Sequence, residues 1–128
     1  MHKGENRKPY DLEDRTELFA KRVRRFIKTL PRTLTNTDDA RQLGRASGSV
    51  GANYIEANEA LSRKDLRVRL KIARKEAKES RLFLRLLDVG DDPCVQEECM
   101  CLVQEATELM NILSAILRKT GGDPNREQ

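Results

Sequence analysis

Lysine and arginine residues between positions 63 and 85 carry the clearest chemical signal in this sequence. At roughly 100° per residue, a helix over this segment places nine cations in one arc of about 60–180° from its core side. No acidic residue falls in that arc. This basic ridge would be roughly 33 Å long, comparable to one turn of a nucleic-acid duplex. Its members are Arg63, Lys64, Arg67, Lys71, Arg74, Lys75, Lys78, Arg81 and Arg85.

The absence of acids from this arc favours a binding surface over a merely solvated one. Like charges one helical turn apart repel by roughly a few tenths of a kcal/mol, so solvated faces usually mix both signs. The basic ridge therefore predicts a polyanion, either RNA or DNA held by its phosphate backbone or an acidic protein. Backbone contact is expected rather than base reading, because aromatic side chains that could stack on bases are scarce. Membrane binding is disfavoured because the ridge shows no bulky apolar flank on its outward side.

A row of polar residues runs along the segment from residue 38 to 61, beside its apolar positions. Half-buried polar side chains need partners. We expect a structural network with Glu76 and Glu79, which would lie on the flank opposite the ridge and could pair with the arginine of the row. An active site or a partner contact is the alternative. The row, at steps of four, four and three, consists of Arg45, Ser49, Asn53 and Glu56.

Groups that commonly perform catalysis or bind metals are sparse. The one histidine, His2, leaves no Ser–His or Cys–His arrangement, and no E-x-x-H motif of a di-iron bundle is present. The odd number of cysteines (Cys94, Cys99 and Cys101) argues against disulfides, and zinc would need further ligands. We expect small thiols packed on a helix. The sequence thus predicts a protein that is not an enzyme, with no cofactor and no metal.

Four segments with a seven-residue apolar repeat must position these groups. Steps alternating four and three cannot be strands, in which side chains alternate every two residues. Turn-forming residues separate the segments, and short connections favour an antiparallel up-down-up-down four-helix bundle. The expected bundle spans residues 10–119, between disordered tails at 1–9 and 120–128. Its helices are expected at about 11–30, 38–61, 63–88 and 94–119, with Thr37 or Asp38, Ser62 and Pro93 at helix starts and Gly90 and Gly121 at helix ends.

Additional apolar and small residues on these helices predict close packing and assembly. Val103, Met110 and Leu117 form a second apolar row on the last helix, and Ile72, Phe83 and Leu86 widen the third. Such arcs indicate deeper burial in one bundle or a face that packs on another subunit, and we favour oligomerisation. The small residues of the second helix, which include Gly44, Gly48 and Gly51, would let a neighbouring helix approach closely.

Composition sets the class of protein. The chain has 128 residues, 38% hydrophobic and 36% charged, which is the size of one domain with a thin apolar content. Narrow core stripes on long helices account for that content, so disorder is not expected. The longest uninterrupted apolar run is too short for a membrane span, and a cytoplasmic location is predicted. The net charge of +4 conceals a basic segment at 62–88 (ten basic, four acidic residues) and an acidic one at 89–128 (three basic, eight acidic).

One stretch of the second helix carries a family resemblance. It reads Q-L-x-R-A-x-x-S-x-x-x-N-x-x-E from Gln42 to Glu56, and the phrases Y-D-L-E-D-R and R-K-E-A-K-E-S-R-L-F-L-R-L-L accompany it. These motifs resemble the bacterial four-helix-bundle proteins first recognised as reading frames in intervening sequences of 23S ribosomal RNA genes (S23 ribosomal protein-like). The family often continues the motif with Glu-Gly, whereas this chain has Glu56-Ala57.

The resemblance implies a homopentameric barrel of four-helix bundles. It also implies kinship with accessory variability determinant proteins of diversity-generating retroelements, which bind reverse transcriptase and nucleic acid through a basic surface. Together with the basic ridge, this gives the prediction of a non-enzymatic, oligomeric accessory protein that binds nucleic acid, with RNA preferred over DNA. The alternative is an interaction scaffold for an acidic protein or a reverse transcriptase.

Overall fold

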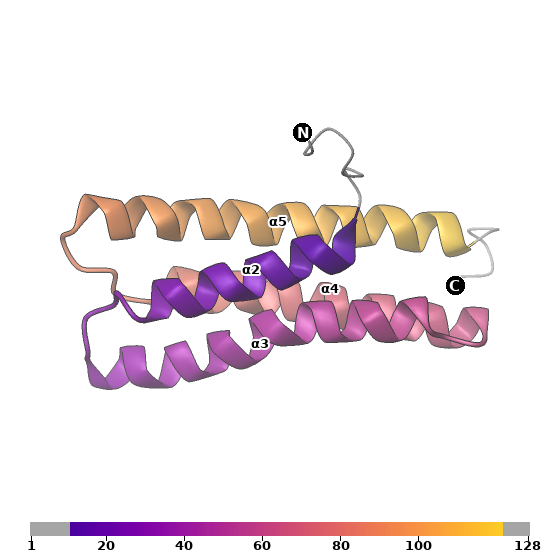
Figure 1. Ribbon diagram of the computed structural model, residues 1–128, viewed down its shortest axis with the longest axis horizontal. Helices are drawn as coiled ribbons and strands as arrows, with labels where there is room; N and C mark the ends of the chain where they lie inside the picture. Colours follow the sequence, from indigo (N-terminus) through magenta and orange to yellow (C-terminus); the bar gives the residue numbers. More distant parts are fainter. Residues whose placement is uncertain (1–10, 122–128) are drawn as a thin grey trace, which may run out of the picture.

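The computed structural model describes residues 11–121, which fold into four α-helices. Consecutive helices pack on one another in an up-down arrangement, and α2 also packs on α5 (Figure 1). The expected all-α four-helix architecture is confirmed. Tails were expected at 1–9 and 120–128. Residues 1–9 and 122–128 lie outside the described residues, and the expectation is wrong for 120 and 121, which belong to the last helix. The helices are α2 (Leu12–Ile27), α3 (Leu34–Asn58), α4 (Arg63–Leu86) and α5 (Pro93–Gly121).

The seven-residue repeat correctly identifies the core. Every predicted core position of α2 is buried, and Leu102, Leu109 and Leu113 of α5 are fully inaccessible. On α3 the pattern holds as far as Ala57 and then fails, because Leu61 is fully exposed. α3 ends at Asn58 and Leu61 belongs to the connection to α4, so the predicted end at residue 61 is wrong.

Other predicted helix limits also differ from the structure. α4 ends at Leu86 and not at 88, and α5 runs from Pro93 to Gly121 and not from 94 to 119. α3 begins at Leu34, one turn before the predicted start at residue 38, because the Thr33 hydroxyl caps it by accepting from the Asn36 amide at 3.1 Å. α2 ends at Ile27 and not at residue 30, although Leu30 in the following turn is still buried. Ser62 caps α4 as expected, and Gly90 has the predicted left-handed conformation (φ 74°) within the connection to α5.

A buried asparagine joins the two connections at one end of the bundle. Asn36 Nδ2 donates to the carbonyl oxygens of Pro31 at 2.9 Å and of Asp88 at 2.8 Å. The Asp88 amide donates back to Asn36 Oδ1 at 2.9 Å. One side chain therefore ties the α2–α3 connection to the α4–α5 connection, 52 residues apart in sequence.

Helices α2 and α3 approach closely at Gly51, as the small residues of α3 predicted. A Cβ atom built there would lie 2.8 Å from Thr16 Oγ1 and 3.2 Å from Thr16 Cβ. Thr16 cannot easily move, because it is buried and its hydroxyl donates to the Leu12 carbonyl at 2.6 Å. At Gly44 the nearest atom would be Ile27 Cδ1 at 3.9 Å, an ordinary contact.

Alanine at these two glycines is expected to change stability in opposite directions. Gly51→Ala should lower the free energy of unfolding by about 1–2 kcal/mol, since overpacking exceeds the gain in helix propensity. Gly44→Ala should raise it by about 0.5–1 kcal/mol, because propensity acts there without a clash. Urea unfolding followed by circular dichroism measures both. Equal effects of the two substitutions would contradict the close approach at Gly51.

Ion pairs join α2 to α5. Arg15 Nε lies 2.7 Å from Glu105 Oε2, and its Nη2 reaches Glu108 Oε1 at 2.8 Å. Arg22, seven residues on, bonds both oxygens of Glu98 at 3.2 Å. The bond to Glu105 raises the pKa of Arg15 above its ordinary value, while hydrogen bonds from Gln104 and Arg15 lower the pKa of Glu108. These acids are thus engaged on the α2 side of α5.

The lowered pKa of Glu108 predicts a pH-dependent role for Arg15. A carboxylate with a depressed folded pKa stabilises the fold above its unfolded value, here 4.5, and loses that contribution as the pH falls through the folded pKa. Arg15→Gln should therefore be less stable than wild type at pH 7, and the difference should shrink between about pH 5 and pH 3. Urea midpoints across this range test it, with Lys21→Gln, in an exposed ion pair with Glu17, as control. A difference independent of pH would contradict the assignment.

The extra apolar rows are mostly absorbed within one chain. Leu117 is buried, and Val103, Met110 and Phe83 are partly buried against the core. Ile72 is also partly buried, and Leu86 is exposed. Among the described helices, α5 is long and apolar enough by composition to cross a membrane, although charged and polar residues interrupt its apolar runs. A helix that lines a protein core can meet the same criterion. In this structure the leucines of α5 are buried in the core of the bundle. Figure 1 also shows that α5 and α3 extend beyond the first turn of α2.

Candidate nucleic-acid interface

The structure divides the predicted basic ridge into two rows along α4. The inner row consists of Arg67, Arg74 and Arg81, at seven-residue intervals, and each donates a hydrogen bond to α5. Arg67 Nη1 bonds the Leu117 carbonyl at 2.7 Å and Thr120 Oγ1 at 3.0 Å. Arg74 Nη1 reaches Ser114 Oγ at 3.2 Å, and Arg81 Nη1 reaches Thr107 Oγ1 at 3.3 Å. The inner row therefore helps to hold α4 against α5 while it keeps its charge near the surface.

The outer row consists of Lys64, Lys71, Lys78 and Arg85, also at seven-residue intervals. All four side chains are exposed, and none makes an ion pair or hydrogen bond to another described residue. The row extends for about 32 Å at 1.5 Å per residue. Arg63, in the first turn of α4, is exposed in the same way. These side chains are free to contact an external anion.

Lys75 belongs to a different group, so the expectation of nine uncompensated cations is wrong at this position. Its Nζ lies 3.5 Å from Glu76 Oε2 and 3.5 Å from Glu79 Oε2. At about 180° from the core position, Lys75 stands at the edge of the arc, and a long side chain can reach the acids on the next flank.

Neighbouring parts of α5 add to the cationic surface without adding carboxylates beside the inner row. Thr107 and Ser114 receive the inner-row hydrogen bonds, and Asn111 lies between them in sequence. Arg118 follows Leu117, whose carbonyl binds Arg67, and it is exposed. Arg118 was not among the predicted site residues, although its place in the last turn of an antiparallel neighbour was a usable signal.

An apolar flank runs beside the outer row, contrary to expectation. Val68, Leu82 and Leu86 of α4 are 46%, 50% and 56% exposed. Leu82 lies one helical turn after Lys78, and Leu86, one turn further on, directly follows Arg85. The prediction that the ridge has no bulky apolar flank is therefore wrong, because apolar side chains occupy outward-facing positions of α4 outside the core stripe.

The polar row of α3 forms a network with α4, at the seam between the two helices. Arg45 lies 3.5 Å from Glu76 Oε1 and 3.4 Å from Glu79 Oε1. Asn53 Nδ2 donates to Ser49 Oγ at 3.0 Å. Glu56 is exposed and has no partner among the described residues. The expected pairing of α3 with the two glutamates is present, and it leaves Glu56 outside.

Two details of this network were not predicted. Arg69 Nη1 donates to Asn53 Oδ1 at 3.1 Å, and its position seven residues before Glu76 would have placed it on that flank. Glu76 is buried, and its Oε1 accepts no hydrogen bond, so the arginine at 3.5 Å compensates its charge only through space. The network therefore holds the α3–α4 seam and offers no open site.

Metal-binding groupings are absent from residues 11–121: no three His, Cys, Asp or Glu side chains converge there. Cys94 and Cys101 are exposed on α5, and Cys99 is half-buried, with its thiol donating to the Leu84 carbonyl at 3.4 Å. Burial raises the pKa of the Cys99 thiol above its ordinary value. Cys99 thus packs as expected, whereas the other two thiols do not.

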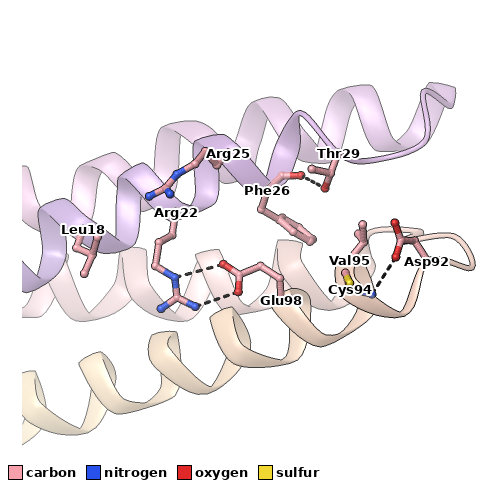
Figure 2. Close-up of a pocket in the computed structure, with 9 residues that line it drawn as sticks. All are labelled: Leu18, Arg22, Arg25, Phe26, Thr29, Asp92, Cys94, Val95 and Glu98. Carbon is pink, nitrogen blue, oxygen red and sulfur yellow. Dashed lines mark hydrogen bonds and ion pairs between the residues drawn. The ribbon is translucent and has the colours of Figure 1, made fainter.

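A hollow of about 510 Å³ lies between α2 and the start of α5 (Figure 2). The Phe26 ring points into it, and the Arg22–Glu98 ion pair spans it. Arg22 and Arg25 contribute two positive charges to its lining, and Asp92 and Glu98 contribute two negative ones. Because these charges balance, the hollow selects no anion, and the α4 surface remains the better candidate interface.

The fold and this surface define a four-helix protein with one strongly basic face. A family model described as 23S rRNA-intervening sequence protein matches residues 10–115. The chain therefore belongs to the 23S rRNA-intervening sequence protein family. No curated protein matches. Among solved structures it is similar to a protein of unknown function from the S23 ribosomal protein family of Bacteroides thetaiotaomicron VPI-5482, with 31% sequence identity and a TM-score of 0.68. The match covers 82% of this chain and 96% of the other.

Proposed function

We propose that this protein is a non-enzymatic RNA-binding protein that holds the phosphate backbone with the outer row of α4. The observation that carries the proposal is the set of four exposed cations, Lys64, Lys71, Lys78 and Arg85, without ion-pair partners among residues 11–121. Their spacing of about 10.5 Å presents positive charge along a length close to one duplex turn. Arg63, at the start of α4, and Arg118, in the last turn of α5, add positive charge at the end of the helix pair where α4 begins.

Electrostatics favours a polyanion over a small anion at this surface. Exposed cations in water gain little from one isolated counter-charge, since surface ion pairs contribute about 0–1 kcal/mol. A polymer that contacts several of them releases its condensed counterions, which yields a large entropic gain. DNA satisfies the same electrostatic requirement. The proposed preference for RNA is therefore tested by comparing the affinities for RNA and DNA.

We also propose that the protein assembles into a homopentamer, as the family resemblance implies. Exposed apolar side chains away from the outer row, such as Leu34 and Ile55 of α3, and the part of α5 beyond the first turn of α2 leave surface for a second copy. Several copies would multiply a weak backbone contact into higher avidity. Kinship with the retroelement accessory proteins would then add a reverse transcriptase as a protein partner.

A second candidate function is a scaffold for an acidic protein. The apolar flank of Val68, Leu82 and Leu86 favours it, because an amphipathic partner helix could place apolar side chains there and acids against the outer row. A polymerase with an acidic segment would fit this description. A nucleic acid would leave the flank uncovered.

Titration of labelled structured RNA and duplex DNA at two salt concentrations tests the first proposal. We expect binding that weakens by about tenfold or more between 50 and 200 mM salt, and a tighter complex with RNA. Absence of binding to either polymer at low salt would contradict the nucleic-acid function and favour the scaffold. Light scattering tests the assembly, and a mass of only 14.7 kDa would exclude the pentamer.

A further inference from the structure

An open apolar groove lies where the outer row ends, between α4 and α5. It has a volume of about 520 Å³, within the range of about 300–1,000 Å³ typical of small-molecule sites. Leu84, Leu87 and Val103 contribute its apolar lining, and Met100, 72% exposed, stands at its rim. Arg85, the last member of the outer row, also lines it. The groove therefore continues the cationic surface directly.

Two glutamines give this groove hydrogen-bonding capacity. Gln96 Nε2 donates to the Gly90 carbonyl at 2.8 Å, and Gln104 Nε2 donates to Glu108 Oε2 at 3.0 Å. These bonds engage one end of each amide and leave both side-chain carbonyl oxygens available as acceptors. Acceptors of this kind match the amino groups that nucleobases carry on their edges.

We infer that the groove receives one unpaired nucleobase of an RNA whose backbone lies on the outer row. Three features select this occupant: a flat apolar ring suits the leucine and valine lining, the Met100 thioether makes favourable contacts with aromatic rings, and Arg85 can hold the adjoining phosphate. This inference rests on the proposed RNA-binding function. It specifies the kind of RNA that is bound, which is a duplex interrupted by an unpaired nucleotide. An unpaired base enters most readily, because a paired one must first be unstacked.

Two RNA stems of about ten base pairs test the inference. One carries a single bulged 2-aminopurine, and the other has the same analogue paired within the stem. Wild type should bind the bulged stem about five-fold more tightly, with a change in analogue emission that the paired stem does not show. Combining Met100→Ala with Gln104→Ala should abolish that preference and leave the affinity for the paired stem within about two-fold. Both residues are exposed, so the fold should be retained.

Leu18→Ala is the matched control, because Leu18 is a 48% exposed leucine in the hollow between α2 and α5. It should keep the preference for the bulged stem. Equal, salt-dependent binding of both stems by wild type would overturn the base site and leave the RNA-binding function standing. Failure to bind either stem at low salt would overturn both. Loss of assembly in the double variant, with both stems bound equally by wild type, would assign the groove to a second copy of the chain and overturn the inference.

Discussion

Reversing the charge of Lys71 and Lys78 together is expected to weaken RNA binding about 50-fold near 0.1 M salt. Each phosphate contact contributes a factor of about eight at this ionic strength through counterion release, and two contacts would be lost. The slope of log affinity against log salt should fall by about two for the same reason. Both lysines are exposed and unpaired among the described residues, so Lys71→Glu with Lys78→Glu should leave the helix content unchanged. Fluorescence anisotropy over a salt series measures affinity and slope.

The chain offers a control with the same change in net charge. Arg25 of α2 and Lys28, which directly follows this helix, are also exposed and without ion-pair partners among residues 11–121. Helix α2 does not pack on α4. Arg25→Glu with Lys28→Glu should lower RNA affinity by no more than about three-fold, through the long-range field alone. Equal losses in the two double variants would show that net charge, and not the outer row, governs binding.

Helical periodicity predicted the core because burial within a bundle depends mainly on position around each helix axis. Leu12, Phe19 and Leu102 are buried as expected, and the same seven-residue repeat correctly predicts most of the other buried positions of their helices. Helix ends depend instead on a few local bonds. Thr33 and Asn36 resembled turn residues, and no apolar repeat supported the first turn of α3, where Leu34 is 84% exposed. Only the cap geometry reveals that the helix begins there.

The candidate interface was predicted as a set of residues but not in its internal organisation. A helical wheel assigns Arg74 and Lys78 to one arc. It cannot show that Arg74 donates a hydrogen bond to Ser114 of α5 whereas Lys78 has no partner among the described residues. The division depends on how far α5 lies from α4 and on the length of each side chain. Lys75 illustrates the same limit, because its side chain reaches acids outside its own arc. Distinguishing bound from free cations required the neighbouring helix.

Replacing Asn36 is expected to destabilise the fold strongly, although its sequence position did not predict a structural role. Asn36→Leu keeps the number and branching of the side-chain heavy atoms but removes both donors and the acceptor, leaving two carbonyl oxygens and the Asp88 amide without their partner. Each unsatisfied buried group costs about 1–3 kcal/mol, and partial access of water to Pro31 and Asp88 reduces the sum. We expect the free energy of unfolding to fall by about 3 kcal/mol. Urea unfolding at a fixed protein concentration measures this change, because assembly would make the midpoint depend on concentration.

Asn58→Leu separates this role from a general effect of removing an asparagine. Asn58 is exposed at the end of α3, and its one side-chain hydrogen bond within residues 11–121, to Glu13 Oε2 at 2.7 Å, faces solvent. Its loss should cost no more than about 0.5 kcal/mol. Asn36→Asp should be at least as destabilising as Asn36→Leu near pH 7, because it keeps the acceptor for the Asp88 amide but places a carboxylate oxygen against the Pro31 and Asp88 carbonyl oxygens. If Asn36→Leu were as stable as Asn58→Leu, the two connections would be held by the buried residues next to them, Leu30 and Leu87, and the asparagine bridge would contribute only to their conformation.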